Sequence, residues 1–299
     1  GSREPPPTRP GTLTCPSRNQ VMADKLKWGI LGTGNIAKAF AKGVLGSKNG
    51  QLAAVGSRTL DKANLFANEF NIPKRHDSYD ALLADKDVQA VYIATPHPLH
   101  AEWAIRAAEA GKHILCEKPV TINHAEAMVV LEAAQRNNVF FMEAFMYRCH
   151  PQTKKLAELL REKIIGEVRV IQASFAFHAG YNPTARLFAQ ELGGGGILDV
   201  GCYCTSAAGL IAGIANGKDF CEPLEVKGVA KIGESRIDDY TVAVAKYPGD
   251  ILAQLSTGVQ VNQENVLRIF GSEGNIFVSQ PWVPARDGGQ TKIIVNRKG

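Results

Sequence analysis

The stretch KWGILGTGNIA, residues 27–37, joins a short apolar run to a glycine-rich turn and the start of a helical pattern. Its turn has the form G-x-G-x-x-A, with Gly32, Gly34 and Ala37 at the fixed positions. The first glycine permits a tight turn, the second lets backbone approach a pyrophosphate, and the small third residue lets helix and strand pack closely. The strand–turn–helix context favours a dinucleotide-binding turn over an ordinary glycine-rich loop. The residues expected to hold the cofactor here are Gly32, Gly34, Asn35 and Ile36.

Short apolar runs alternate with helical patterns from residue 25 to about residue 144. Such alternation is typical of βαβ units, which form a parallel sheet covered by helices on both faces. We therefore predict an α/β Rossmann domain, a doubly wound parallel sheet, over residues 22–144. Its strands are predicted at 27–32, 51–57, 88–94, 112–117 and 139–144, and its helices at 34–46, 60–70, 98–111 and 123–138.

The pattern changes after residue 144. A helical pattern, a long strand-like run and a second helical pattern come first. Several strand-like runs joined by short turns then follow. This order predicts an α+β domain over residues 145–299, with a largely antiparallel open sheet and helices on one face. The helices are predicted at 151–163 and 196–213, and the strands at 167–179, 224–233, 238–247, 251–262 and 266–280. Residues 1–21 are rich in proline, and we expect a disordered leader or an expression remnant there.

The composition excludes several classes of protein. With 45% hydrophobic and 21% charged residues among 299, the chain has the composition of a soluble globular protein. A net charge of +5 without a basic stripe argues against nucleic acid as a partner, and we expect no membrane-spanning stretch. The six cysteines show no C-x-x-C pair and no zinc-ligand spacing. We therefore predict reduced thiols, no metal site and a cytoplasmic location.

The end of the second predicted strand discriminates between NAD and NADP. An NAD site usually places an acidic residue there to bind the ribose 2′-hydroxyl. This strand instead ends in Gly56-Ser57-Arg58. Because a guanidinium can pair with a 2′-phosphate and a serine adds a donor, Ser57 and Arg58 predict NADP as the cofactor, with NAD as the alternative. A solvated arginine at a helix start would look the same in the sequence.

Two further segments are expected at one edge of the parallel sheet, where ligands bind outside the carboxyl ends of the strands. TPHPLH, residues 95–100, follows one predicted strand, and the lysine of EKP, residues 117–119, ends the next. Lys118 would then lie beside the nicotinamide end of a dinucleotide. The pattern leaves open which of the two histidines contacts the cofactor and which only begins a helix. The residues predicted at the cofactor site here are Thr95, His97, Glu117 and Lys118.

Three segments taken together resemble the glucose–fructose oxidoreductase/inositol dehydrogenase/rhizopine-catabolism (Gfo/Idh/MocA) family. They are GILGTGNIA, TPHPLHAEWAIRAAEAGKHILCEKP and LGGGGILDVGCY. Within the family, EAFMYRCHP and RLFAQELGGGGILDVGCYC are similar to the branch that holds dimeric dihydrodiol dehydrogenase, NADP-dependent xylose dehydrogenase and glucose–fructose oxidoreductase. The resemblance runs in order from about residue 27 to residue 284.

The resemblance implies catalytic roles for Lys118, Asp199 and Tyr203. It implies hydride transfer between the cofactor, NADP or NAD, and a carbinol or carbonyl carbon of a sugar, a polyol or a cyclic diol. Asp199 and Tyr203 stand at i and i+4, so both would project from one helix face. We expect the charge of Lys118 to lower the pKa of Tyr203, so that either group can act as general acid or base. The alternative is a non-catalytic sensor or transcriptional regulator with the same fold.

The resemblance also implies a substrate pocket and an assembly. The segments around the pocket contain Arg148, His178 and Arg186, together with His150 and Tyr181. A carbohydrate-like small molecule is the expected partner. Relatives normally continue through a closing segment with a final helix, so we expect either a fragment or a shortened variant. We also expect a homodimer or a dimer of dimers through the second-domain sheet, whose predicted semi-apolar face includes Val242, Val244, Leu252 and Leu255.

Overall fold

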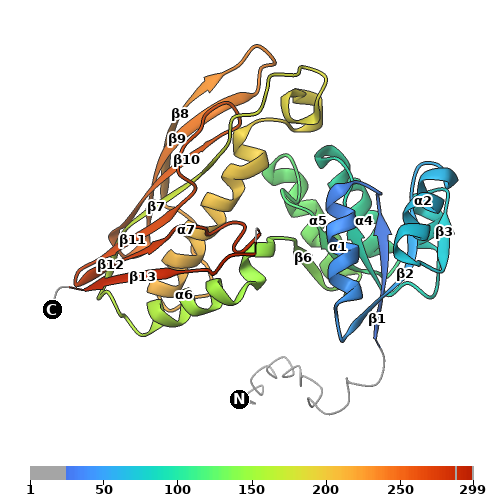
Figure 1. The fold of residues 1–299 in the computed structure, drawn as a ribbon, viewed down its shortest axis with the longest axis horizontal. Helices are drawn as coiled ribbons and strands as arrows, with labels where there is room; N and C mark the ends of the chain where they lie inside the picture. The colour runs from blue at the N-terminus through green and yellow to red at the C-terminus, as the bar shows by residue number, and fades with distance from the viewer. Residues whose placement is uncertain (1–24, 287, 298–299) are drawn as a thin grey trace, which may run out of the picture.

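Six parallel strands form the first sheet, in the order β3-β2-β1-β4-β5-β6 (Figure 1). The order reverses direction between β1 and β4, as in a doubly wound fold, so the predicted Rossmann domain is confirmed. The strands are β1 (Leu26–Leu31), β2 (Gly50–Gly56), β3 (Lys74–His76), β4 (Ala90–Ile93), β5 (His113–Cys116) and β6 (Phe141–Glu143). The computed structural model describes residues 25–286 and 288–297. The expected leader, residues 1–21, lies outside the described residues.

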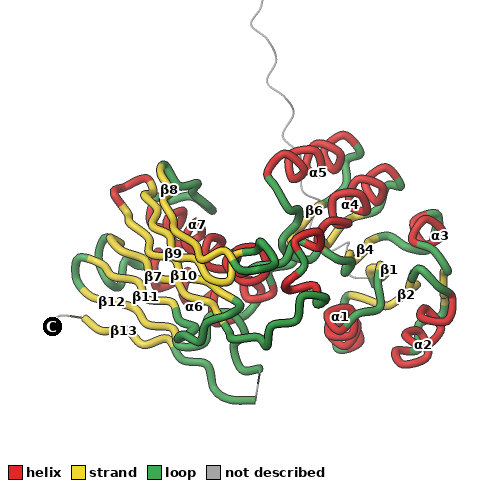
Figure 2. The backbone as a smooth tube through the Cα atoms, turned by 90° about the horizontal axis from the view of Figure 1, so that it is seen from above, coloured by secondary structure: helices red, strands yellow, loops and turns green. Residues whose placement is uncertain are grey.

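Helices cover this sheet on both faces. Figure 2 shows α1 (Asn35–Leu45) and α2 (Leu60–Phe70) on one side of the strands, and α4 (His100–Glu109) and α5 (His124–Arg136) on the other. Fully buried alanines let the helices approach the sheet closely, namely Ala37 and Ala41 in α1 and Ala104, Ala107 and Ala108 in α4. The short elements β3 and α3 (Tyr79–Leu83) were not predicted, because three and five residues are too few to show a period.

The second sheet has seven strands in the order β13-β12-β11-β7-β10-β9-β8. All neighbouring pairs are antiparallel except β7 and β10, which run parallel, so the largely antiparallel prediction is confirmed. The strands are β7 (Val168–Ala176), β8 (Glu225–Ile232), β9 (Asp238–Tyr247), β10 (Ile251–Gly258), β11 (Leu267–Gly271), β12 (Gly274–Val278) and β13 (Ile293–Arg297). The edge strand β13 was not predicted.

Two helices pack on the face of this sheet that points towards the first domain, α6 (Pro151–Arg161) and α7 (Cys202–Ala215). The side chains between them and the sheet form the second-domain core, which includes Ile171 of β7 and Ile211 of α7. In the described part of the chain, no helix covers the opposite face (Figure 1). That outer face is open to solvent.

The outer face carries half-exposed apolar residues, as predicted, with one correction. Val242, Val244 and Leu252 are 57%, 50% and 51% exposed. Leu255 is 8% exposed and belongs to the core between sheet and helices. Since side chains alternate along a strand, Leu255 lies on the opposite face from Leu252, three positions earlier. The prediction that both residues face outwards was wrong.

The run Gln190–Ala215 is long and apolar enough to cross a membrane by length and composition alone. The sequence prediction that no stretch reaches this length therefore needs correction. However, 72% of the apolar window is buried inside the protein. The apolar composition is explained by α7, which is the central helix of the second-domain core.

Candidate active site

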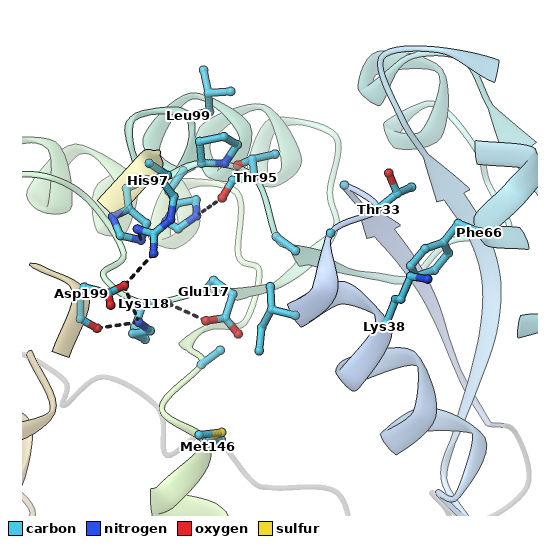
Figure 3. Close-up of a pocket in the computed structure, with 18 of the residues that line it drawn as sticks. Thr33, Lys38, Phe66, Thr95, His97, Leu99, Glu117, Lys118, Met146 and Asp199 are labelled. Carbon is cyan, nitrogen blue, oxygen red and sulfur yellow. Dashed lines mark hydrogen bonds and ion pairs between the residues drawn. The ribbon is translucent and has the colours of Figure 1, made fainter. Parts of the chain in front are cut away.

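A cavity of about 840 Å³ extends from the glycine turn of the first domain to the helix α7 of the second. Figure 3 shows its two ends: Thr33, Lys38 and Phe66 lie at one, and Lys118 and Asp199 face each other at the other. The volume lies in the range of small-molecule and cofactor sites. The predicted site residues that line it are Gly32, Gly34, Ile36, Ser57, Arg58, Thr95, His97, Glu117, Lys118, Arg186, Asp199 and Tyr203.

The glycine turn presents open backbone to the cavity. Gly32 has φ +102°, and a Cβ there would lie 2.8 Å from the carbonyl oxygen of Ala94. At Gly34 a Cβ would meet no atom within 4 Å, so the space beside it is free for a ligand. Gly34 precedes α1, whose first N–H groups have no helical partner and favour an anion. The turn therefore has the features of a pyrophosphate site.

Cationic side chains line the cavity beyond the end of β2. Arg58 lies there with Lys62, one turn along the start of α2. Ser57 is buried beside them, and Thr59 caps α2 by accepting a hydrogen bond from the backbone N–H of Lys62. Lys62 was not predicted, although its i+4 spacing from Arg58 was a usable signal. Two cations at a helix start suit the 2′-phosphate of NADP.

Two side chains after β4 have different roles. Thr95 is 7% exposed, and no described residue is a hydrogen-bond partner of its hydroxyl. His100 is fully buried, with Nδ1 2.8 Å from the carbonyl oxygen of Pro119 and Nε2 2.8 Å from that of Thr95. His100 therefore ties the loop after β4 to the loop after β5, which carries Lys118. A buried hydroxyl without a partner is costly, so Thr95 is suited to bind a ligand.

The three predicted catalytic residues converge at the second-domain end of the cavity. Nζ of Lys118 donates a hydrogen bond to the backbone carbonyl of Asp199, 2.7 Å away, and lies 3.8 Å from its carboxylate (Figure 3). The same ammonium lies 5.3 Å from the centre of the Tyr203 ring. Arg186 donates from Nη2 to the Asp199 carboxylate at 2.8 Å. Lysine and aspartate come from different domains, so these contacts cross the domain boundary.

The protonation state of Tyr203 differs from the prediction. Its ring is packed among Phe145, Phe175 and Trp282 and is 5% exposed. Burial raises the pKa of the Tyr203 phenol well above its usual value, and the neighbouring Cys202, Glu117 and Asp199 act in the same direction. The predicted lowering by Lys118 is therefore wrong, because burial and the acidic neighbours together raise this pKa, against a smaller lowering by Arg286. Tyr203 therefore keeps its proton at neutral pH.

Asp199 stands on a distorted turn of helix. Residues Ile197–Gly201 form a π-helical turn that leads into α7, and such turns are frequent at functional sites. Asp199 and Tyr203, which follows in α7, nevertheless line the same cavity, as the i, i+4 spacing predicts. The carboxylate of Asp238 accepts hydrogen bonds from the N–H of Ile197 at 2.8 Å and from the Thr241 hydroxyl at 3.1 Å. No signal in the sequence links Asp238 to this turn.

Several predicted residues lie outside the cavity. Arg148 lines a separate cavity of about 680 Å³, where its guanidinium lies 5.7 Å from the Phe220 ring centre. His178 is exposed and forms an isolated bridge with Gln260. Arg148 and His178 do not line the cavity, so their predicted contact with the substrate stays a prediction. The side chain of His150 caps α6, the Tyr181 hydroxyl contacts that of Ser235, and Asn35 is exposed at the start of α1.

Glu117 supports the rim of the sheet. It lines the cavity and accepts a hydrogen bond from the hydroxyl of Tyr92. Burial raises the pKa of Glu117, while the contacts with Tyr92 and Lys118 oppose this rise. Within residues 25–286 and 288–297, no group of three His, Cys, Asp or Glu side chains is placed to hold a metal ion.

Comparisons with known proteins agree with this geometry. The profile described as "Oxidoreductase family, NAD-binding Rossmann fold" (GFO_IDH_MocA) matches residues 26–145, and that of the "GFO/IDH/MocA C-terminal domain" matches residues 153–277. Trans-1,2-dihydrobenzene-1,2-diol dehydrogenase of Mus musculus is 35% identical over 91% of this chain and 78% of its own length. The human protein of the same name is 32% identical over 87% and 76%.

Solved structures with the same fold include a ketoreductase and an aldose-aldose oxidoreductase. A 3-ketoreductase from Actinomadura kijaniata, in complex with NADP and TDP-benzene, is 29% identical, with a TM-score of 0.81 over 92% of this chain and 82% of its own. An aldose-aldose oxidoreductase from Caulobacter crescentus, complexed with glycerol, is 26% identical, with the same TM-score and coverage. The residues of the present cavity fit NADP: the open glycine turn, the cations after β2 and the unpartnered Thr95 hydroxyl match its phosphates and polar groups.

The unpartnered hydroxyl gives a test of this fit. We expect Thr95→Val to raise the free energy of unfolding of the cofactor-free protein by about 1 kcal/mol, since it removes a buried polar group without a partner. The same change should weaken NADPH binding, measured by fluorescence titration. Thr121→Val is the matched control, because the buried Thr121 hydroxyl donates to the carbonyl of Asn123 at 2.7 Å and its loss should destabilise the protein. Equal destabilisation by both changes in urea would contradict the assignment.

Proposed function

Since this chain belongs to the Gfo/Idh/MocA family of NAD(P)-dependent oxidoreductases, we propose that it transfers a hydride between NADP and a carbinol or carbonyl carbon of a sugar, a polyol or a cyclic diol. One observation carries this proposal. Lys118, Asp199 and Tyr203 converge at one end of a cavity whose other end has the glycine turn and the cations of a dinucleotide site.

Side chains of this protein would donate or accept the proton of the substrate oxygen. NADP supplies or accepts the hydride, so the substrate oxygen must gain or lose a proton at the same time. The protonated phenol of Tyr203 and the side-chain nitrogen of Lys118 are two groups at this end of the cavity that can transfer a proton. In the reducing direction either can donate to the carbonyl oxygen, and in the oxidising direction the same group takes the proton back. The Asp199 carboxylate would accept a hydrogen bond from a substrate hydroxyl.

Both polar and apolar side chains line the second-domain end of the cavity, and this supports the proposed substrate class. Lys118, Arg186 and Asp199 offer charged donors and acceptors, while Phe175 and Val283 offer an apolar wall. A hydroxylated ring has both kinds of surface, with polar hydroxyls around an apolar ring face. The relatives act in name on a dihydrodiol or on aldoses, and a solved neighbour binds a TDP ligand.

Substitution of the two proton donors tests the chemistry. We expect Lys118→Met to lower turnover by orders of magnitude, and Tyr203→Phe to lower it about 10²-fold or more, with NADPH binding nearly intact. Tyr147→Phe is the matched control: Tyr147 is buried in the same aromatic cluster, but its hydroxyl contacts Ser206 and it does not line the cavity. Steady-state rates over aldoses, polyols and cyclic diols give the measurement. Wild-type turnover in both variants would refute the assignment.

The alternative function is a sensor or regulator that binds the dinucleotide without turnover. It is favoured only if the protein binds NADPH tightly and oxidises or reduces none of these substrates. The presence of all three residues, in contact, favours the enzyme.

Cofactor preference has a separate test at the other end of the cavity. Arg58→Ala should weaken NADPH binding by about 1.5–3 kcal/mol, as expected for loss of a charge-assisted pair with the 2′-phosphate. Lys62→Ala should cost less, because an ammonium acts as a point charge. NADH, which lacks the 2′-phosphate, is the internal control and should bind all variants alike. Equal affinity of the wild type for NADPH and NADH would exclude this role for both residues.

We further propose that the outer face of the second sheet joins two copies of the chain. Apolar residues of this face lie side by side on neighbouring strands. Exposed Val229 of β8 pairs with exposed Val242 of β9, and exposed Leu252 of β10 pairs with half-buried Val170 of β7. A broad semi-apolar surface on a soluble protein usually marks an interface, and two-fold dimers are the commonest arrangement.

Introduction of a charge into this face should separate the copies. Val244 lies beside Lys227 of the edge strand β8, so Val244→Lys places two like charges next to each other on the apolar side of this face. We expect light scattering at micromolar concentration to show a dimer for the wild type and a monomer for this variant. Leu131→Lys, on the exposed side of α5, is the control and should remain dimeric. A monomeric wild type would exclude the interface.

We also propose that the protein is located in the cytoplasm. All five described cysteines, Cys116, Cys149, Cys202, Cys204 and Cys221, are free thiols. Unpaired and mostly buried thiols are usual in a reducing compartment, which supports the cytoplasm.

A further inference from the structure

The two domains touch at a histidine and a glycine. Gly193, the first of four consecutive glycines, has φ +66°, and a Cβ there would lie 3.2 Å from the Cβ of His97 and 3.1 Å from Ile122. Both neighbours belong to the first domain. The left-handed backbone and these close neighbours together favour glycine at this position, which lets the second-domain backbone come near. As a result, the carbonyl oxygen of Gly193 lies 3.1 Å from Nδ1 of His97.

The partners of the His97 ring define its tautomer. The Gly193 carbonyl can only accept, so Nδ1 must carry the hydrogen. On the other side, Nη1 of Arg186 lies 3.2 Å from Nε2, and a guanidinium can only donate. Both contacts are satisfied together by one form of the ring, which is neutral, with hydrogen on Nδ1 and a lone pair on Nε2.

The surroundings favour this neutral form. Burial and the charge of Arg186 lower the pKa of His97 to about 4, with smaller effects of the same sign from His100 and Lys118. The hydrogen bond to Gly193 acts in the opposite direction without overcoming them. The ring of His97 is 6% exposed and lies 5.6 Å from that of His100, centre to centre. The ring therefore remains an acceptor for Arg186 at neutral pH.

Arg186 links the His97 ring to the candidate active site, because it contacts both His97 and Asp199. Its side chain is 40% exposed, and a long exposed side chain has many rotamers unless two partners fix it. The partners are Nε2 of His97 at 3.2 Å and the carboxylate of Asp199 at 2.8 Å. The same carboxylate oxygen lies 3.8 Å from Nζ of Lys118. The direction of the guanidinium thus sets where the carboxylate lies relative to the ammonium.

We propose that neutral His97 is a positioning residue, which orients Arg186 so that its guanidinium holds the Asp199 carboxylate beside Lys118. His97 does so from the first domain, while Arg186 and Asp199 belong to the second. One ring therefore couples the placement of the domains to the geometry of the site. The inference rests on the proposed function for the roles of Lys118 and Asp199, but the state of the ring can be measured without any turnover.

The first measurement is ¹⁵N NMR of the histidine side chains during a pH titration. We expect the His97 ring to show hydrogen on Nδ1 and a pKa near 4. Arg186→Gln should raise that pKa, because it removes a neighbouring positive charge. Hydrogen on Nε2, or a pKa near the usual 6.5, would overturn the proposal whether or not the protein proves to be an enzyme.

The second measurement compares two amide variants that each keep one contact. In His97→Asn the amide can still donate towards Gly193, but no acceptor reaches Arg186. In His97→Gln an acceptor can still reach Arg186, but the contact with Gly193 is lost. We expect His97→Asn to lower kcat about tenfold or more through misplacement of Asp199, with KM for NADPH unchanged, and His97→Gln to retain several-fold more turnover.

Other results of this comparison would count against the proposal. Equal kcat losses would show that the acceptor for Arg186 is not the property that matters. A selective rise in KM for NADPH would instead assign His97 to cofactor binding. Thermal melting of both variants establishes that they are folded before the rates are compared.

Discussion

The common direction of six strands is the constraint on which the rest of the structure depends. Because β1, β4 and β5 run parallel, their carboxyl ends meet at one rim. The glycine turn, Thr95 and Lys118 lie together at that rim, although their segments are up to about ninety residues apart in the chain. The second domain then needs only one short helical turn, Ile197–Gly201, to bring Asp199 to the ammonium. The site is therefore shared between domains, although the larger part of it rests on the first.

The features that were predictable from the sequence share one property: they depend on local patterns. The periodicity of apolar residues predicted nearly every long strand and helix. The βαβ topology then predicted that the residues at the ends of the parallel strands lie at one edge of the sheet. Asp199 and Tyr203 were found through their spacing together with the family resemblance. Leu255 was misplaced because β10 carries a leucine on each face, Leu252 outside and Leu255 inside, so residue type alone did not decide the orientation. Arg148 lines a different cavity, and its position in the chain gave no signal of this.

Other features of the site arise from contacts between distant segments and left no local signal. Asp238 reaches the turn of Asp199 from β9, and Gly193 meets His97 ninety-six positions earlier. The protonation of Tyr203 is of the same kind. Sequence reasoning identified the lysine close to it, but the aromatic shell of Phe145, Phe175 and Trp282 comes from three separate segments. Burial by that shell, together with the acidic neighbours, raises the pKa of Tyr203, and only the folded chain shows this.

The four-glycine loop has a consequence for how this protein can diverge. A Cβ at each position would crowd a different neighbour. It would be tight against His97 at Gly193, and it would collide with the carbonyl of Leu187 at Gly194, with Asp238 at Gly195 and with the backbone of Gly258 at Gly196. No single second mutation can make room at all four positions, because these neighbours lie in four different parts of the chain. We therefore expect these four glycines to tolerate fewer substitutions over evolution than exposed positions of the chain.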